Sequence, residues 1–422
     1  MSPNQLSALF FFQVFFILAV CRSVGFLGRR LGQPQVVGEM IAGVIIGPSV
    51  FGLLCPGLQQ AIFPKDSLKL LYVLAQLGVG LYMFLVGAEF RTDLFRSKAR
   101  SAISVSVAGM AAPFILGGSL ATWLWKVPGL FSDQATQPEA MLFLGAAMSI
   151  TAFPMLARII YERGITGTPL GTLALAAGAI DDVIAWCVLA IVLASFGGSA
   201  TTAIQAIGGG LIYGLFTLTV GRKLFTKFDT IAQANGKITP TLLATTLSLL
   251  MLGSWITDAI GIHSVFGGFI LGIAMPRGFF TKELRKQLEP IAVVFLLPMF
   301  FTFSGLNTRL DTVNSLELLL ISVVMLLSAV AAKGAACWLA ARLNGESNRT
   351  ALAVGTLMNA RGLMELIILN IGLQKGLIQP ALFSIMVLMA IVTTLMASPL
   401  FELVYRTKTR AAATKDAYAA KL

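Results

Sequence analysis

Apolar runs of about 20 residues, the length that an α-helix needs to cross a bilayer, recur along all 422 positions of the chain. Composition agrees, because 57% of the residues are hydrophobic, only 12% are charged and the mean hydropathy is +0.85. We therefore predict an all-α, polytopic membrane protein. Two predicted segments, 35–47 and 264–276, are short, so a re-entrant or tilted segment remains open there. The thirteen predicted transmembrane helices lie at about 7–28, 35–47, 68–90, 99–125, 139–162, 169–196, 203–225, 238–260, 264–276, 284–306, 315–342, 350–373 and 379–405.

Basic residues are distributed unevenly between the predicted loops. With the N-terminus outside, most lysines and arginines fall on the inner side, which is the positive-inside pattern of membrane proteins. This pattern places the C-terminal tail at 406–422 in the cytoplasm, and we expect a multi-pass protein of a bacterial inner membrane. The net charge of +12 follows from this topology, so no nucleic-acid partner is required. The basic residues left on the outer side are Lys65, Lys69, Lys126, Arg309 and Lys375.

Two adjacent aspartates, Asp181 and Asp182, lie in the middle of the apolar run 169–196. A charged side chain at the centre of a membrane-spanning helix costs about 2.5–3.5 kcal/mol on insertion scales, and such residues mark ion or proton pathways. A structural ion pair would account for one aspartate but poorly for two. We therefore interpret this pair as an ion or proton site.

The two halves of the chain contain similar segments. The glycine-rich stretch 36–48 resembles 265–276, and the next helices end in a shared G-x-x-x-R-x-D at 87–93 and 305–311. In the predicted topology each matching pair runs in opposite directions, which indicates an inverted repeat, the architecture of many secondary transporters. Chance similarity between glycine-rich segments is the alternative. The matched glycines are Gly38 and Gly267, Gly43 and Gly272, and Gly87 and Gly305.

The repeat predicts interruptions in the fifth helix and in its mate, the twelfth. SITAFP at 149–154 places Ser149, Thr151 and Pro154 in mid-helix, and proline removes one backbone donor there. Backbone freed in this way is tolerated only where protein or a water-filled cavity satisfies it. A simple proline kink is the alternative for this helix.

The twelfth predicted helix carries the polar sequence TLMNARGLMELI, with Asn359, Arg361 and Glu365 at similar depth. Arg361 and Glu365 are four residues apart, so they can pair on one face of a helix. Two crossing, interrupted helices would present carbonyl groups and amide ends to an ion at the midplane.

Lys333 is the one lysine far from any predicted helix end. Counting about 1.5 Å per residue places it at a depth similar to that of Asp181, so the two can form a pair. A lysine that snorkels to water is the usual alternative, but this one lies too deep for an easy reach. Because neighbouring helical positions point about 100° apart, Asp181 can face Lys333 while Asp182 faces a cavity and binds a cation.

Other functional classes fit the sequence less well. Sodium-coupled uptake of a small organic anion, a symporter function, is the second candidate, although it does not require a paired aspartate and lysine. An intramembrane aspartyl protease needs its two aspartates on different helices, which adjacent residues cannot provide. We expect a transporter that is not an enzyme and needs no cofactor.

The motifs SITAFPMLARI, GAIDDVIAW and MNARGLMELIILNIG, with the glycine-flanked Lys333, resemble the monovalent cation:proton antiporter-2 family across nearly the whole chain. This branch of the cation/proton antiporter superfamily includes Kef-type transporters and plant cation/proton exchangers. The resemblance implies an antiporter fold with two crossing discontinuous helices, a homodimer, and Na⁺ or K⁺ exchanged for protons. The Asp-Asp pair is similar to electrogenic sodium/proton antiporters, whereas the flanking sequence is closer to plant potassium exchangers.

The resemblance also implies a division of the chain and roles for single residues. Asp182, Asp181 and Thr151 would bind the monovalent cation or protons beside Ser149, with Lys333 as charge partner of Asp181. Arg361 and Glu365 would form a structural ion pair in the crossing helices, near Asn359. The implied parts are scaffold helices at 1–91 and 238–306, which would form the dimer interface, core helices at 99–196 and 315–405, a linker helix at 203–225 and the tail at 406–422.

Overall fold

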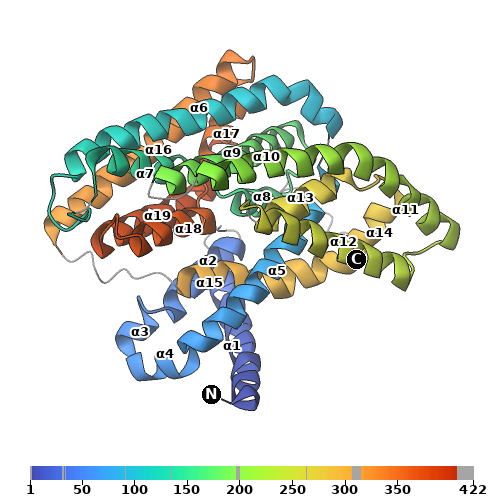
Figure 1. Cartoon of the computed structure of the whole chain (residues 1–422), viewed down its shortest axis with the longest axis horizontal. Coiled ribbons are helices and arrows are strands. Elements are labelled where there is room, and N and C mark those ends of the chain that lie inside the picture. The colour runs from blue at the N-terminus through green and yellow to red at the C-terminus, as the bar shows by residue number, and fades with distance from the viewer. Residues whose placement is uncertain are drawn as a thin grey trace.

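The computed structural model describes residues 2–30, 33, 35–90, 92–133, 135–195, 200–262, 264–306 and 315–405. Within these ranges every regular element is a helix, and extended pairing is confined to one isolated bridge between Phe131 and Ile378. The helices (Figure 1) are α1 (Pro3–Arg30), α2 (Gln35–Ile46), α3 (Phe51–Leu54), α4 (Pro56–Ile62), α5 (Lys65–Glu89), α6 (Thr92–Leu124), α7 (Gln137–Ser149), α8 (Phe153–Glu162), α9 (Pro169–Ser195), α10 (Ala200–Phe216), α11 (Arg222–Asn235), α12 (Pro240–Ala259), α13 (Ser264–Ala274), α14 (Phe279–Pro290), α15 (Leu297–Leu306), α16 (Leu316–Leu343), α17 (Asn348–Leu357), α18 (Leu363–Gln374) and α19 (Pro380–Val404), with π-helical turns η1 (Thr217–Gly221) and η2 (Ile291–Leu296).

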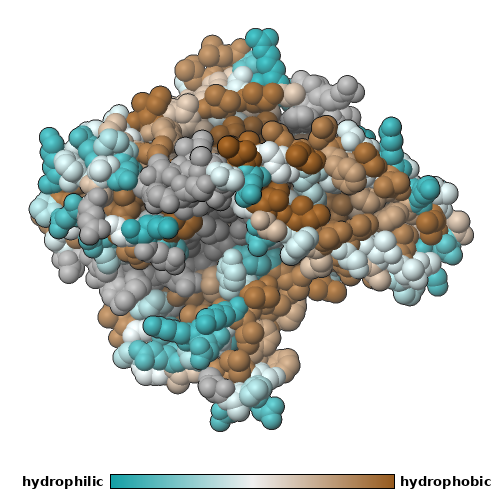
Figure 2. Space-filling view, viewed as in Figure 1, coloured by the Kyte–Doolittle hydropathy of each residue, from teal (hydrophilic) through white to brown (hydrophobic). Residues whose placement is uncertain are grey.

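Ten helical segments of the described chain are long and apolar enough to cross a membrane, and α13 is a shorter apolar helix. Figure 2 shows broad apolar areas on one face, most continuous toward its right-hand part, while many hydrophilic residues lie at the outer ends of the molecule. This distribution suits a surface in contact with lipid rather than water. The prediction of an all-α, polytopic membrane protein is confirmed.

The two predicted interruptions are present. α7 ends at Ser149 and α8 begins at Phe153, with Ile150 and Ala152 in extended conformation between them. The alternative of a proline kink is wrong, because Pro154 lies in the first turn of α8, where its missing amide costs no helical hydrogen bond. In the second half, α17 ends at Leu357 and α18 begins at Leu363.

Glycine contacts between helices occur in matching pairs, as the predicted repeat requires. A Cβ at Gly38 would lie 2.6 Å from the Cα of Gly25, and one at Gly267 would lie 2.3 Å from the carbonyl oxygen of Gly253. These contacts join α1 to α2 and, equivalently, α12 to α13. Because only glycine lets two helix backbones approach this closely, the matched residues serve packing of the same kind in both halves.

A second pair of glycine contacts joins α2 to α15 and, equivalently, α13 to α5. A Cβ at Gly305 would lie 2.4 Å from the carbonyl carbon of Gly43, and one at Gly272 would lie 2.1 Å from the carbonyl oxygen of Phe84. The arginine and aspartate of the shared motif at 305–311 lie outside the described residues, as do Arg91 and the tail at 406–422. The repeat is therefore supported by its glycines.

The aspartate-bearing helix α9 lies among the interrupted helices. It packs against α6, α7, α8 and α17, while α16, which carries Lys333, packs against α6, α17 and α19. Both charged helices thus contact α6 and α17, and this arrangement brings side chains about 150 positions apart in sequence into one buried region.

Candidate functional site

The two interrupted helices cross and satisfy part of each other's backbone. The amide of Ala152 donates a hydrogen bond of 3.0 Å to the carbonyl of Ala360, which joins the first break to the second. The hydroxyl of Thr394, on α19, accepts from the amide of Arg361 and donates to its carbonyl, both at 2.8 Å. Non-helical backbone at this depth is therefore held by protein groups, as a membrane interior requires.

Asp181 is fully buried and has two polar partners on one carboxylate oxygen. Thr151 Oγ1 donates to Asp181 Oδ2 at 2.6 Å, and Lys333 Nζ lies 3.4 Å from the same oxygen. Both charged side chains have an exposed fraction of 0%, so each compensates a charge that water does not solvate. Ser106 of α6 lies beside the same carboxylate.

Asp182 is buried like its neighbour but has a different environment. Its Oδ1 finds no hydrogen-bond partner in the described part of the chain, and Asp181 is the charged group that acts on it. The Oδ1 of Asp181 is also without a partner there, as is the hydroxyl of Ser106. A buried carboxylate oxygen without a donor is costly, so this group of oxygens is suited to take up a cation or a proton.

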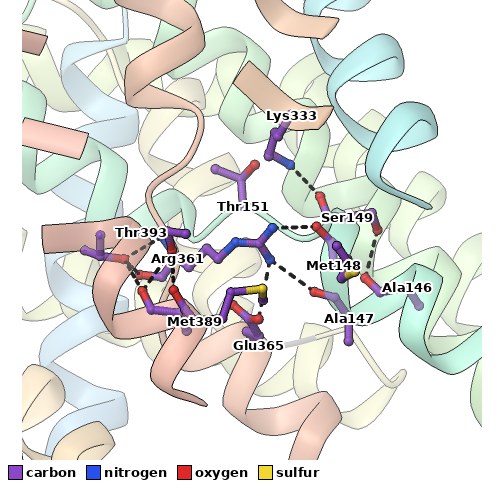
Figure 3. Close-up of polar contacts among 12 residues, drawn as sticks. Ala146, Ala147, Met148, Ser149, Thr151, Lys333, Arg361, Glu365, Met389 and Thr393 are labelled. Carbon is purple, nitrogen blue, oxygen red and sulfur yellow. Dashed lines mark hydrogen bonds and ion pairs between the residues drawn. The ribbon is translucent and has the colours of Figure 1, made fainter. Parts of the chain in front are cut away.

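Two buried, positively charged side chains lie at the C-terminal end of α7 (Figure 3). Lys333 donates to the carbonyl of Ser149, and Arg361 donates to the carbonyls of Ala147 at 3.3 Å and Met148 at 2.6 Å. The last carbonyls of a helix carry its partial negative charge and have no partner within the helix. These two side chains therefore stabilise the C-terminal end of the half-helix α7.

Arg361 and Glu365 form an ion pair of 3.4 Å between Nη1 and Oε1, and both side chains are fully buried. The predicted pairing is present, but its explanation was wrong. Arg361 precedes the first residue of α18 and lies in the crossing segment, so the two residues do not share a helix face. The contact forms because the extended segment directs Arg361 back across the first turn of α18.

Ser149 and Asn359 lie beside this region and form different hydrogen bonds. The hydroxyl of Ser149 donates to the carbonyl of Ala146 in its own helix, so Ser149 approaches the charged centre through its backbone carbonyl. Asn359 donates to the carbonyl of Gly355 at 2.8 Å, and its Oδ1 is buried without a partner in the described ranges. A Cβ on Gly334 would lie 3.2 Å from the side-chain nitrogen Nδ2 of Asn359, so Asn359 packs beside the backbone next to Lys333.

Two residues of this region were not identified from the sequence. Ser106 lies among several serines of α6, and Thr394 lies in an apolar C-terminal helix with ordinary composition. Neither stands in a charged or proline-containing motif. Both act through contacts between distant segments, and spacing along the chain carries no signal of such contacts.

Comparison with known proteins places this geometry in context. A family profile described as "Sodium/hydrogen exchanger, transmembrane" matches residues 15–404. The Na(+)/H(+) antiporter NhaS4 of Synechocystis is 40% identical over 391 residues, covering 92% of this chain and 95% of that protein. The K(+)/H(+) antiporter 1 of Saccharomyces cerevisiae is 32% identical, covering 94% of this chain and 46% of its own, so the chain spans about half the length of that relative.

A solved structure, that of the sodium proton antiporter MjNhaP1 from Methanocaldococcus jannaschii at pH 8, has a similar fold. The TM-score is 0.61, and the match covers 94% of this chain and 96% of that one. Sequence identity is 16%, so this likeness concerns the arrangement of helices.

Proposed function

The chain belongs to the sodium/hydrogen exchanger family, and on this premise we propose that it exchanges a monovalent cation, Na⁺ or K⁺, for protons across a membrane. The observation that carries the proposal is the buried pair Asp181 and Asp182, whose Oδ1 atoms have no partner in the described ranges. The related sequences named as Na⁺/H⁺ and K⁺/H⁺ antiporters leave the choice of cation open.

Exchange follows if a cation and protons compete for the same carboxylates. Asp182 would bind the cation with Asp181 and Thr151, and protonation would remove the charge that attracts it. The carboxylate of Asp181 is already bonded to Thr151 and Lys333. Asp182 is then the carboxylate that can alternate between a bound cation and a bound proton.

An elevator-type movement would deliver the site to each side in turn. In this account α6 to α9 and α16 to α19 form a mobile core that slides against a scaffold of α1 to α5 and α12 to α15. A bare buried charge costing about 3 kcal/mol would suppress such movement on the order of 100-fold. A bound cation or bound protons neutralise the site and permit it, so the two directions carry different cargo.

Lys333 makes the exchange electrogenic in this proposal. When Asp181 takes part in cation binding, the ion pair with Lys333 loosens, and the lysine can release a proton and take it back in the opposite step. The charge moved in each cycle then differs between the two directions. Exchange that is insensitive to membrane potential would contradict this part of the proposal.

Topology and assembly complete the proposal. We place the N-terminus outside and the C-terminus in the cytoplasm of a bacterial inner membrane, because basic residues cluster on the predicted inner side. A homodimer through the scaffold would cover exposed apolar side chains of α1, among them Phe11 and Phe15. The second candidate, sodium-coupled uptake of an organic anion, is not favoured, because the matching relatives are named as cation/proton antiporters.

The test is proton flux in proteoliposomes that contain the purified protein and an imposed pH gradient. Sodium, potassium and lithium are added in turn, and we expect at least one of them to dissipate the gradient. Asp182→Asn abolishes the response, whereas Asp258→Asn, at an exposed position of α12, serves as the matched control. No response to any cation from the folded, unaltered protein would refute cation/proton exchange.

A further inference from the structure

The half-helix α8 carries polar side chains that face helices of the proposed scaffold. Arg158 and Tyr161 are three residues apart, so they lie on the same side of α8. α8 contacts α2 and α5, both in the proposed scaffold, as well as α9 in the proposed core. The same short helix begins directly after Thr151 and Ala152, so its position determines where the crossing segment lies.

Tyr161 bonds α8 directly to the proposed scaffold. Its hydroxyl donates to Glu289 at the end of α14, and Glu289 also pairs with Arg285. Arg285 pairs in turn with Glu89 at the end of α5, and its guanidinium lies 6.0 Å from the centroid of the Tyr161 ring. Two scaffold helices thus hold one tyrosine of the core through a connected set of charges.

Arg158 brings a second contact of this kind, deeper in the protein. It donates to Glu162 of its own helix at 2.6 Å, and α8, which carries it, packs against α2, which carries Glu39. Arg158, Glu39 and Tyr82 of α5 are all nearly fully buried. Arg158 Nη1, Glu39 Oε2 and the Tyr82 hydroxyl have no hydrogen-bond partner within the described ranges, so each of these buried polar groups is incompletely bonded.

A small cavity lies beside these contacts. It is lined by Tyr82, Glu89, Tyr161 and Glu289 together with Leu175 of α9. Leu175 precedes Asp182 by two helical turns, so the two residues lie on the same side of α9. The tyrosine and its partner therefore line a cavity that borders α9 two helical turns before Asp182.

We propose that the hydrogen bond from Tyr161 to Glu289, together with the ion pairs that Arg285 forms with Glu289 and Glu89, is a latch that favours the conformation seen here. Tyr161 and Glu289 are positioning residues: they do not bind the transported ions, and they determine the fraction of molecules whose core occupies this position. The proposal depends on the alternating exchange described above, because any sliding of α8 past α14 must break this bond.

A latch of this kind has a signature that distinguishes it from a residue that only supports the fold. The apparent affinity for a cation on one side falls in proportion to the fraction of molecules open to that side. Removing the latch depopulates the present conformation, so apparent affinity weakens at the side to which this conformation exposes the site and strengthens at the other side. Loss of fold would instead weaken both.

The experiment compares everted and right-side-out membrane vesicles from a host that lacks its own antiporters. Half-saturating concentrations of Na⁺ and K⁺ are measured on each side for the unaltered protein and for Tyr161→Phe. A hydrogen bond from a partly exposed tyrosine to a carboxylate predicts that the ratio of the two constants changes about fivefold. Tyr213→Phe is the matched control, because its hydroxyl donates at 2.9 Å to the carbonyl of Gly267 and takes no part in the contact between Tyr161 and Glu289.

Glu289→Gln and the double variant provide the second measurement. The single variant is expected to shift the ratio in the same direction as Tyr161→Phe, and the double variant is expected to shift it no further, because both changes act on one bond. An unchanged ratio, or constants that weaken equally on both sides, would overturn the latch while leaving exchange intact. Absence of exchange in the unaltered protein would refute the proposed function, and the latch with it.

Discussion

The two interrupted helices have similar backbones but different chemistry. The break after α7 supplies Thr151 to Asp181, and the carbonyls at its end accept hydrogen bonds from Lys333 and Arg361. The break after α17 supplies Arg361 itself, which pairs with Glu365 in the same half of the chain. One break therefore faces the aspartates, whereas the other provides the positive charge that stabilises the first.

This difference shows how a repeated architecture can hold an asymmetric site. The glycine contacts that join the helices occur in matching pairs, so packing follows the repeat. The sequence has its aspartate pair only in α9, and among the described residues the buried lysine lies in α16, so the charged residues do not follow the repeat. We expect substitutions at the repeated glycines to have similar effects in both halves, and substitutions at the charged residues to have unequal ones.

The largest effect is expected at Arg361. Arg361→Met leaves Glu365 buried without its ion-pair partner and removes donors from the carbonyls of Ala147 and Met148. Breaking a buried ion pair in this way should lower the free energy of unfolding by about 3–5 kcal/mol. Thermal unfolding in detergent measures it, and an unchanged midpoint would show that the second break is not a structural support.

Lys333→Met is expected to come next, with a loss of about 3 kcal/mol, because it leaves Asp181 charged and buried. The double variant Lys333→Met with Asp181→Asn should recover most of this loss, since no uncompensated charge remains. The same unfolding assay compares the three proteins. A double variant less stable than Lys333→Met alone would contradict the pairing of these two residues.

The repeated glycines test the symmetric side of the comparison. In Gly87→Ala the new Cβ would lie 2.2 Å from the carbonyl of Phe269, and in Gly305→Ala it would lie 2.4 Å from Gly43. Each should destabilise the protein by about 1–3 kcal/mol through overpacking. Gly214→Ala, where a Cβ would meet no other described residue within 4 Å, is the control and should be neutral or slightly stabilising. A large loss in one half alone would count against the repeat.

Thr151→Val should have the smallest effect on stability and a specific effect on transport. It removes the hydroxyl that donates to Asp181 at 2.6 Å while keeping the shape of the side chain. A hydrogen bond to a charged group contributes about 1.5–3 kcal/mol, so the half-saturating cation concentration should rise about tenfold. Thr246→Val, a buried threonine bonded within α12, is the control. Equal cation dependence in both variants would remove Thr151 from the site.

The sequence predicted an all-helical membrane fold and both breaks, because apolar length, proline and polar residues at membrane depth are local signals. The predicted number of thirteen transmembrane helices is not confirmed, since ten segments of the described chain are long and apolar enough to cross a membrane. It also predicted which charged residues meet, since few charges share that depth. It gave a wrong reason for the contact between Arg361 and Glu365, because a helix was assumed where the chain is extended. The partners of Glu39 and Glu289 were not predictable, since they depend on how α8 packs against distant helices.

The central claim is that Asp182 exchanges a proton for a cation, and proton release on cation binding tests it most directly. Purified protein in a weakly buffered detergent solution is titrated with the transported cation while the released protons are measured. The account predicts release from the unaltered protein and from Asp258→Asn, and none from Asp182→Asn. Release from folded Asp182→Asn equal to that of the unaltered protein would contradict it.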